Sequence, residues 1–104
     1  PAQAETPGLY LSKDRDFRGD YRTYTTSRSS FGGGFSDEAS SVENYRSTAW
    51  VFFDDENYRD RHYCLRPGES VRNLHDPAWN FGDKISSALK LNTSSCAGYP
   101  TFFG

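Results

Sequence analysis

The apolar and aromatic positions of the chain fall into two stretches that resemble each other. In the first stretch, residues 9–26, Tyr21, Thr23 and Thr25 recur at a period of two, which is typical of a β-strand with one buried face. The segment before them, KDRDFRG, is polar, and its Gly19 is free to adopt a positive φ. The pattern predicts a strand, a folded hairpin and a second strand.

The same pattern restarts at residues 49–66, AWVFFDDENYRDRHYCLR. Three residue pairs match at an offset of 41 residues: Leu11 with Phe52, Asp14 with Asp55, and Phe17 with Tyr58. Further short strands are predicted at residues 40–45, within residues 67–74 and within residues 81–91. The chain therefore contains two copies of one unit of β-structure.

A heptapeptide of the form F-x-D-x-x-S-S closes each unit. It occurs as FSDEASS at Phe35–Ser41 and as FGDKISS at Phe81–Ser87, at an offset of 46 residues. The chance expectation for D-x-x-S-S in a chain of this composition is roughly 0.14 copies, so two copies at matching places indicate duplication. A repeat of this length means two similar units, each too small to bury a face alone. With about four strands in each unit, the sequence predicts an all-β, eight-stranded sandwich of two Greek keys, at about residues 9–46 and 49–91.

Composition supports a β fold and excludes several partners. The chain of 104 residues contains seven Tyr, eight Phe and two Trp but no Met, and aromatic residues fit pleated, half-buried surfaces. A formal net charge of −2 without a basic stripe gives no basis for nucleic-acid binding. No apolar run approaches the ~18 residues that a membrane-spanning helix needs. One domain, expected to be a monomer, is predicted.

The two ends of the chain and its two cysteines indicate an exported protein. Residues 1–8 are expected to form a flexible leader, and Ala2–Ala4 have the A-x-A form of a signal-peptidase site. Cys64 and Cys96 are interpreted as one disulfide that ties the extension at residues 92–104 to the domain. In the chain-entropy model such a loop stabilises the fold by about 3–4 kcal/mol. Two buried free thiols are the alternative, whereas a cysteine metal site lacks the C-x-x-C spacing.

The repeated heptapeptide has two interpretations. In the structural one, Asp37 and Asp83 are turn residues that bind nearby amide groups, and Ser40 and Ser86 cap the loops. In the functional one, each loop supplies a carboxylate, a hydroxyl and main-chain carbonyls to Ca²⁺, which prefers oxygen ligands. Both hairpins carry further acidic residues: Asp14 and Asp16 in the first, and Asp54, Asp55 and Glu56 in the second.

The heptapeptide, following an aromatic hairpin of the type YLSKDRDFRGDY, resembles the loop of the microbial βγ-crystallins. The stretch CLRPGESVRNL followed by FGDKISS is particularly similar to secreted actinobacterial members. The resemblance covers about residues 9–91. It implies a sandwich of two Greek keys with two calcium sites, in which each loop contributes to both sites.

The resemblance also implies the calcium ligands. They are Asp37, the carbonyl of Glu38, Ser40, Asp83, the carbonyl of Lys84 and Ser86, with hairpin carbonyls near Asp14 and Asp55. Two departures weaken the expected affinity: Ser36 and Gly82 replace the family's first Asn or Asp, and Asp60 replaces the glycine that the first unit has at Gly19. Dissociation constants on the order of 10⁻⁵–10⁻³ M are expected.

A secreted calcium-binding module that calcium stabilises is the predicted function, and an enzyme is not expected. Neither His62 nor His75 lies in a recognisable catalytic motif. One alternative is a secreted proteinase inhibitor that uses the loop at residues 27–35 against a protease. The other is a killer-toxin-like antimicrobial protein that uses the aromatic tail at residues 98–104 against a cell-surface target.

Overall fold

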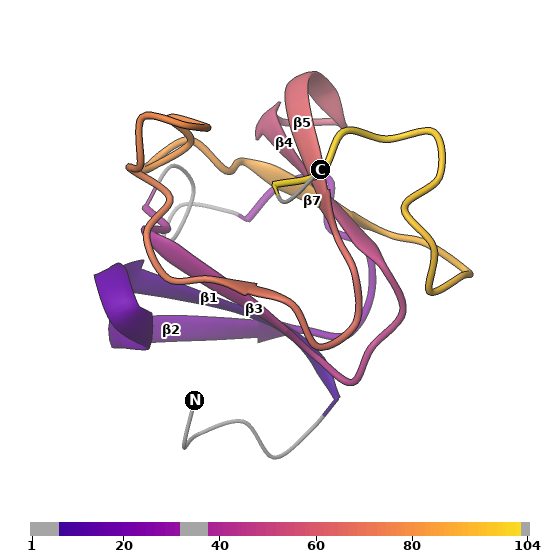
Figure 1. Cartoon of the computed structure of the whole chain (residues 1–104), viewed down its shortest axis with the longest axis horizontal. Coiled ribbons are helices and arrows are strands. Elements are labelled where there is room, and N and C mark those ends of the chain that lie inside the picture. Colours follow the sequence, from indigo (N-terminus) through magenta and orange to yellow (C-terminus); the bar gives the residue numbers. More distant parts are fainter. Residues whose placement is uncertain (1–6, 32–37, 103–104) are drawn as a thin grey trace.

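The computed structural model of the chain describes residues 7–31 and 38–102 and contains two antiparallel sheets that face each other (Figure 1). The first sheet has the order β2-β1-β3-β6 and contains β1 (Gly8–Asp14), β2 (Arg18–Tyr24), β3 (Ser41–Tyr45) and β6 (Ser70–Val71). The second has the order β5-β4-β7 and contains β4 (Trp50–Asp55), β5 (Arg59–Leu65) and β7 (Ser87–Lys90). A short 3₁₀ turn, η1 (Arg15–Phe17), joins β1 to β2.

The two units exchange their third strands. β6 belongs to the second unit but pairs with β3 of the first, and Arg28 of the first unit forms an isolated bridge with Ala88 in β7. The main-chain bonds of this bridge measure 2.8 and 3.0 Å, and the Ser27 hydroxyl accepts the amide of Lys90 at 2.8 Å. This exchange is the connection of two Greek keys in one sandwich. The described residues hold seven strands, and Arg28 marks the place of the eighth.

Alternating side chains of the strands fill the core between the sheets. Leu9 and Leu11 of β1 face Trp50 and Phe52 of β4, and all four are fully buried. Phe81 and Ile85, which flank Asp83 in the second heptapeptide, are also fully buried. The core therefore anchors the loop on both sides of its candidate ligand.

Within the described part of the chain, no helix is long and apolar enough to cross a membrane.

The C-terminal extension covers the outer face of the second sheet. Cys96 forms a disulfide with Cys64 of β5, with an S–S distance of 2.03 Å, so the predicted pairing is confirmed and the chain has no free cysteine. Val51 and Phe53 are buried beneath this segment, which explains why β4 is apolar on both faces. Phe102 is buried in the core, rather than exposed as an aromatic contact patch in the tail would require.

The two hairpins have the same backbone conformation. Three pairs of residues at the predicted offset adopt left-handed φ values: Asp16 and Asn57 (60° and 61°), Phe17 and Tyr58 (61° and 60°), and Gly19 and Asp60 (77° and 73°). Asp60 thus takes a conformation that costs a residue with a Cβ more than it costs glycine.

Candidate cation sites

The second serine of each heptapeptide holds a hairpin in place. In the first unit, the Ser41 hydroxyl donates to the carbonyl of Asp14 at 2.7 Å and accepts the amide of Phe17 at 3.0 Å. Ser41 is fully buried, so these two bonds satisfy a hydroxyl that water does not reach. The bonds fix the turn between β1 and β2 against the start of β3.

Ser87 makes the same two bonds in the second unit. Its hydroxyl donates to the carbonyl of Asp55 at 2.6 Å and accepts the amide of Tyr58 at 3.1 Å. No separate role for these serine clasps, Ser41 and Ser87, was predicted from the sequence, although the repeat contains both. One lone pair of the Asp14 carbonyl and one of the Asp55 carbonyl are therefore already engaged, which leaves one lone pair on each for any cation.

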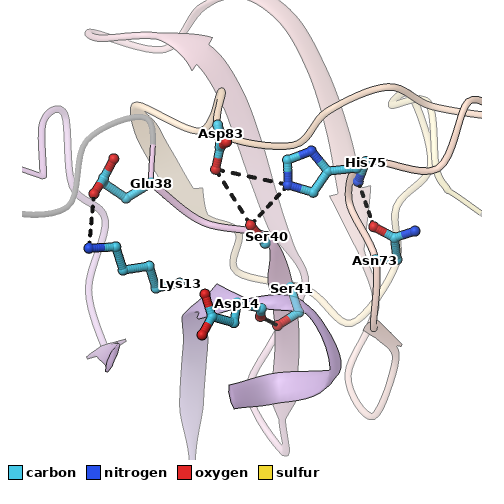
Figure 2. Close-up of polar contacts among 8 residues, drawn as sticks. All are labelled: Lys13, Asp14, Glu38, Ser40, Ser41, Asn73, His75 and Asp83. Carbon is cyan, nitrogen blue, oxygen red and sulfur yellow. Dashed lines mark hydrogen bonds and ion pairs between the residues drawn. The ribbon is translucent and has the colours of Figure 1, made fainter. Parts of the chain in front are cut away.

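The two heptapeptide loops meet at Ser40 and Asp83. The amide of Asp83 donates to the carbonyl of Ala39 at 2.9 Å, and the Ser40 hydroxyl donates to Oδ1 of Asp83 at 3.4 Å (Figure 2). Asp83 has a φ of 56°, a conformation that aspartate tolerates better than most residues. The structure thus brings a predicted hydroxyl ligand of the first loop to a predicted carboxylate ligand of the second.

His75 is the residue of this site that sequence reasoning missed. Its Nε2 lies 3.0 Å from Oγ of Ser40 and 4.0 Å from Oδ1 of Asp83 (Figure 2). A Cβ on Gly82 would lie 2.1 Å from the Nδ1 of His75, so no other residue fits at Gly82 unless the ring moves. The imidazole therefore occupies the space that a side chain at position 82 would need. No motif in the sequence links His75 to Ser40, which lies 35 positions away.

The remaining predicted ligands are less closely assembled. The side chain of Glu38 forms an ion pair with Lys13 at 3.5 Å. The predicted ligand is the main-chain carbonyl of Glu38, which this ion pair does not involve. The Ser86 hydroxyl donates to the carbonyl of Lys84 at 3.3 Å, so these two predicted ligands of the second loop contact each other. Asp37 lies outside the described residues. The structure therefore describes one carboxylate–hydroxyl pair of the two that the repeat predicts.

An acidic cluster lies on the second hairpin. Carboxylate oxygens of Asp54, Asp55 and Asp60 lie within 4.8 Å of one another. Burial raises the pKa of Asp54 above its ordinary value, and the charges of Asp60 and Asp55 raise it further, against the lowering effect of Arg61 and Lys84. Asp54 and Asp55 were both noted in the sequence as acidic residues of a hairpin near the predicted cation sites, whereas Asp60 was not. Asp60 joins them at the position where the first hairpin has Gly19.

An open hollow lies beside Ser40 at the first hairpin. It has a volume of about 430 Å³ and is lined by Asp14, Arg15, Asp16, Arg18, Ser40 and His75. Asp16 forms an ion pair with Arg72 at 2.8 Å. The hollow leaves room for a hydrated ion, and its two carboxylates and two guanidinium groups balance in formal charge.

The chemistry of the site suits a cation rather than nucleophilic catalysis. In a serine–histidine–aspartate relay, the acid and the serine contact different ring nitrogens, whereas Ser40 and Asp83 both face Nε2 of His75. A carboxylate and a hydroxyl of adjoining loops are ligands that Ca²⁺ accepts. Imidazole nitrogen is a ligand of transition metals instead. The oxygen atoms of Ser40 and Asp83 therefore suit calcium, and Nε2 of His75 is a nitrogen donor beside them.

Comparison with known proteins agrees with this fold. The sequence model of the beta/gamma crystallin family matches residues 9–89. A beta gamma crystallin from Ciona intestinalis is 29% identical, with a TM-score of 0.70, over 80% of this chain and 98% of that one. Two further structures show the same fold. A betagamma-crystallin from an archaeon is 21% identical, with a TM-score of 0.68, over 81% of this chain and 96% of its own. Spherulin 3A from Physarum polycephalum is 24% identical, with a TM-score of 0.68, over 89% of this chain and 93% of its own.

No curated protein matches the sequence. The family match nevertheless spans both units, including the second heptapeptide and all of β7 except Lys90. The exchanged third strands and paired hairpins of the structure agree with that match. This chain therefore belongs to the beta/gamma crystallin family.

Proposed function

We propose that this chain is a calcium-binding module whose folded state calcium stabilises. The family is structural and generally non-enzymatic, and some of its members bind calcium. The observation that carries the proposal is the distance of 3.4 Å between the Ser40 hydroxyl and the Asp83 carboxylate. These two oxygens come from different repeat units, so an ion bound to both would join the units.

Each proposed site takes oxygens from both loops. The first uses the carboxylate of Asp83, the hydroxyl of Ser40 and the carbonyl of Glu38. The second uses the corresponding oxygens of Asp37, Ser86 and Lys84. Because Ca²⁺ accepts six to eight oxygens in flexible geometry, water and hairpin carbonyls complete each shell.

Calcium stabilises the fold by mass action because the unfolded chain lacks the assembled site. At a calcium concentration 100-fold above the dissociation constant, one site contributes about 2.7 kcal/mol. For a domain of this size, that raises the melting temperature by about 10–20 °C. Gly82 supplies no side-chain oxygen, so dissociation constants of about 10⁻⁴ M, near the weak end of protein calcium sites, are expected.

The test is calorimetric titration with calcium, together with thermal unfolding in calcium and in a chelator. Asp83→Asn is expected to weaken the first site, and Ser86→Arg the second. Asp20→Asn is the matched control, since Asp20 is an exposed aspartate of β2 outside both loops. Absence of both binding heat and a shift in melting temperature for the unmodified chain at 10 mM calcium would refute the proposal.

We also propose that the protein acts outside the cytosol. Structural disulfides persist in oxidising compartments and are rare in reducing ones, and the Cys64–Cys96 bond fixes the extension to β5. Thiol labelling of the protein isolated from its native source tests this. A disulfide-bonded pool in the medium is expected, and a reduced pool inside cells would contradict the proposal.

A further inference from the structure

We propose that His75, Asp83 and Ser40 also form a site for a divalent transition metal, namely Zn²⁺, in which the imidazole supplies a nitrogen ligand that calcium does not use. The inference rests on the first cation site proposed above and names a second metal that this site accepts. Its basis is the imidazole that the structure places at the meeting point of the two loops (Figure 2).

The donor atoms match zinc chemistry. Zinc binds imidazole nitrogen at about 2.0–2.1 Å and carboxylate oxygen at about 2.0–2.2 Å, with tetrahedral angles. Two such donors lie about 3.4 Å apart, while Nε2 of His75 and Oδ1 of Asp83 lie 4.0 Å apart. The side chains of His75 and Asp83 are 43% and 59% exposed, so both are free to make the small rotation that closes this gap.

The surroundings orient the ring and leave an entry path. Gly82 lies against the Nδ1 side of His75, so Nε2 is the nitrogen that faces Ser40 and Asp83. The hollow of about 430 Å³ opens beside Ser40 and His75 and gives water access to the remaining coordination positions. A zinc ion there would replace the hydrogen bond of 3.0 Å between His75 and Ser40.

Only one half of the molecule offers this nitrogen. Val71 and Arg28 occupy corresponding places, since each pairs with the final strand of the other unit. Counting on from those residues, His75 corresponds to Gly32 in the sequence. The second histidine, His62, lies elsewhere: its Nδ1 is 3.1 Å from the carbonyl of Asp60, and its ring contacts Phe53. One zinc ion per chain is therefore expected.

The experiment titrates the whole chain with Zn²⁺ alone by calorimetry and records ¹⁵N shifts of the histidine rings during the titration. One zinc per chain and a metal-dependent shift of Nε2 of His75 are expected. His75→Ala should lower the zinc affinity by about tenfold or more, since it removes a direct ligand. His62→Ala is the matched control and should bind zinc as the unmodified chain does. The ring measurement uses the unmodified protein, so it decides the matter even if a variant does not fold.

Two outcomes overturn the inference: zinc binding that His62→Ala abolishes, and ring shifts of His75 that do not respond to zinc. A parallel calcium titration separates this inference from the proposed function. If His75→Ala loses zinc and keeps calcium, both hold. If calcium fails to bind any form while zinc still shifts Nε2 of His75, the calcium proposal fails and this inference stands.

Discussion

The two repeat units share their scaffold but differ where a cation would bind. Both hairpins place three residues in left-handed conformations at matching positions, and Ser41 and Ser87 each clasp a hairpin through two bonds. Both features fix the main chain of a hairpin, the clasps through a serine hydroxyl that bonds to main-chain groups. A change at either place is therefore expected to disturb the fold of its unit.

The differences concern exposed side chains at the candidate cation sites. The first hairpin has Gly19 where the second has Asp60, which completes an acidic cluster with Asp54 and Asp55. The second unit has a histidine beside its loop where the first has a glycine in the sequence. The two units therefore share their frame, while the exposed side chains around the candidate cation sites differ between them.

Removing the disulfide is expected to have the largest effect, and it acts only on the second unit. The double change Cys64→Ser and Cys96→Ser should lower the free energy of unfolding by about 3–4 kcal/mol, because the unfolded chain is no longer cross-linked. Urea unfolding with and without a reducing agent measures this. The double variant should not respond to the reducing agent, and equal stability of the oxidised and reduced unmodified protein would contradict the account.

The serine clasps are expected to contribute equally. Ser41→Ala and Ser87→Ala each leave a partly buried amide and a carbonyl without their partner, which should cost about 1–3 kcal/mol. Chemical denaturation of the two variants measures the costs. A large difference between them would show that the two hairpins are not held in the same way.

Exchanging the residues at Gly19 and Asp60 should give effects of opposite sign. A Cβ at Gly19 would lie 2.7 Å from Oδ2 of Asp14, so Gly19→Asp should destabilise the fold by about 1–2 kcal/mol. Asp60→Gly should stabilise it by up to about 1 kcal/mol, because it relieves the left-handed strain and a like charge. Thermal unfolding in a chelator at neutral pH measures both, and a loss of stability in Asp60→Gly would contradict the strain argument.

The smallest expected effect is the pH dependence that Asp54 contributes. Because burial raises the pKa of Asp54 in the folded state, its contribution to stability is fully present below the unfolded pKa and is lost as pH rises through the folded pKa. Asp54→Asn should therefore stabilise the protein at pH 7 and raise its melting temperature. The gain in the free energy of unfolding should be no more than about 1 kcal/mol, because solvent screens the group. The two proteins should melt alike at pH 3, below the ordinary pKa of 3.8. A stabilising effect that persists at pH 3 would rule out charge as its cause.

Much of the fold was predictable from the sequence because the signals are local. Alternation, turn residues and the offset of the matched pairs predicted the hairpins, including the left-handed position of Asp60. The pairing of Cys64 with Cys96 followed from there being only two cysteines. Likewise, the duplicated heptapeptide drew attention to Ser40 and Asp83.

The features of the fold and of the candidate site that were not predicted depend on contacts between segments that lie far apart in the sequence. Nothing local shows that Arg28 pairs with Ala88 in the other unit. From the sequence, Gly82 was predicted only to weaken the cation site, whereas the structure shows that the ring of His75 occupies the space that a side chain there would need. That ring reaches the site because the segment after β6 crosses to the loops. Such positions follow from tertiary packing and not from a motif.

The most direct test of the central claim is a crystal structure of the protein grown in 10 mM calcium, with the ions located by anomalous scattering. A calcium ion is expected within about 2.3–2.6 Å of both the Ser40 hydroxyl and an Asp83 carboxylate oxygen, the usual range for calcium ligands. An ion bound only at Asp54, Asp55 and Asp60, or no ion at either loop, would contradict it.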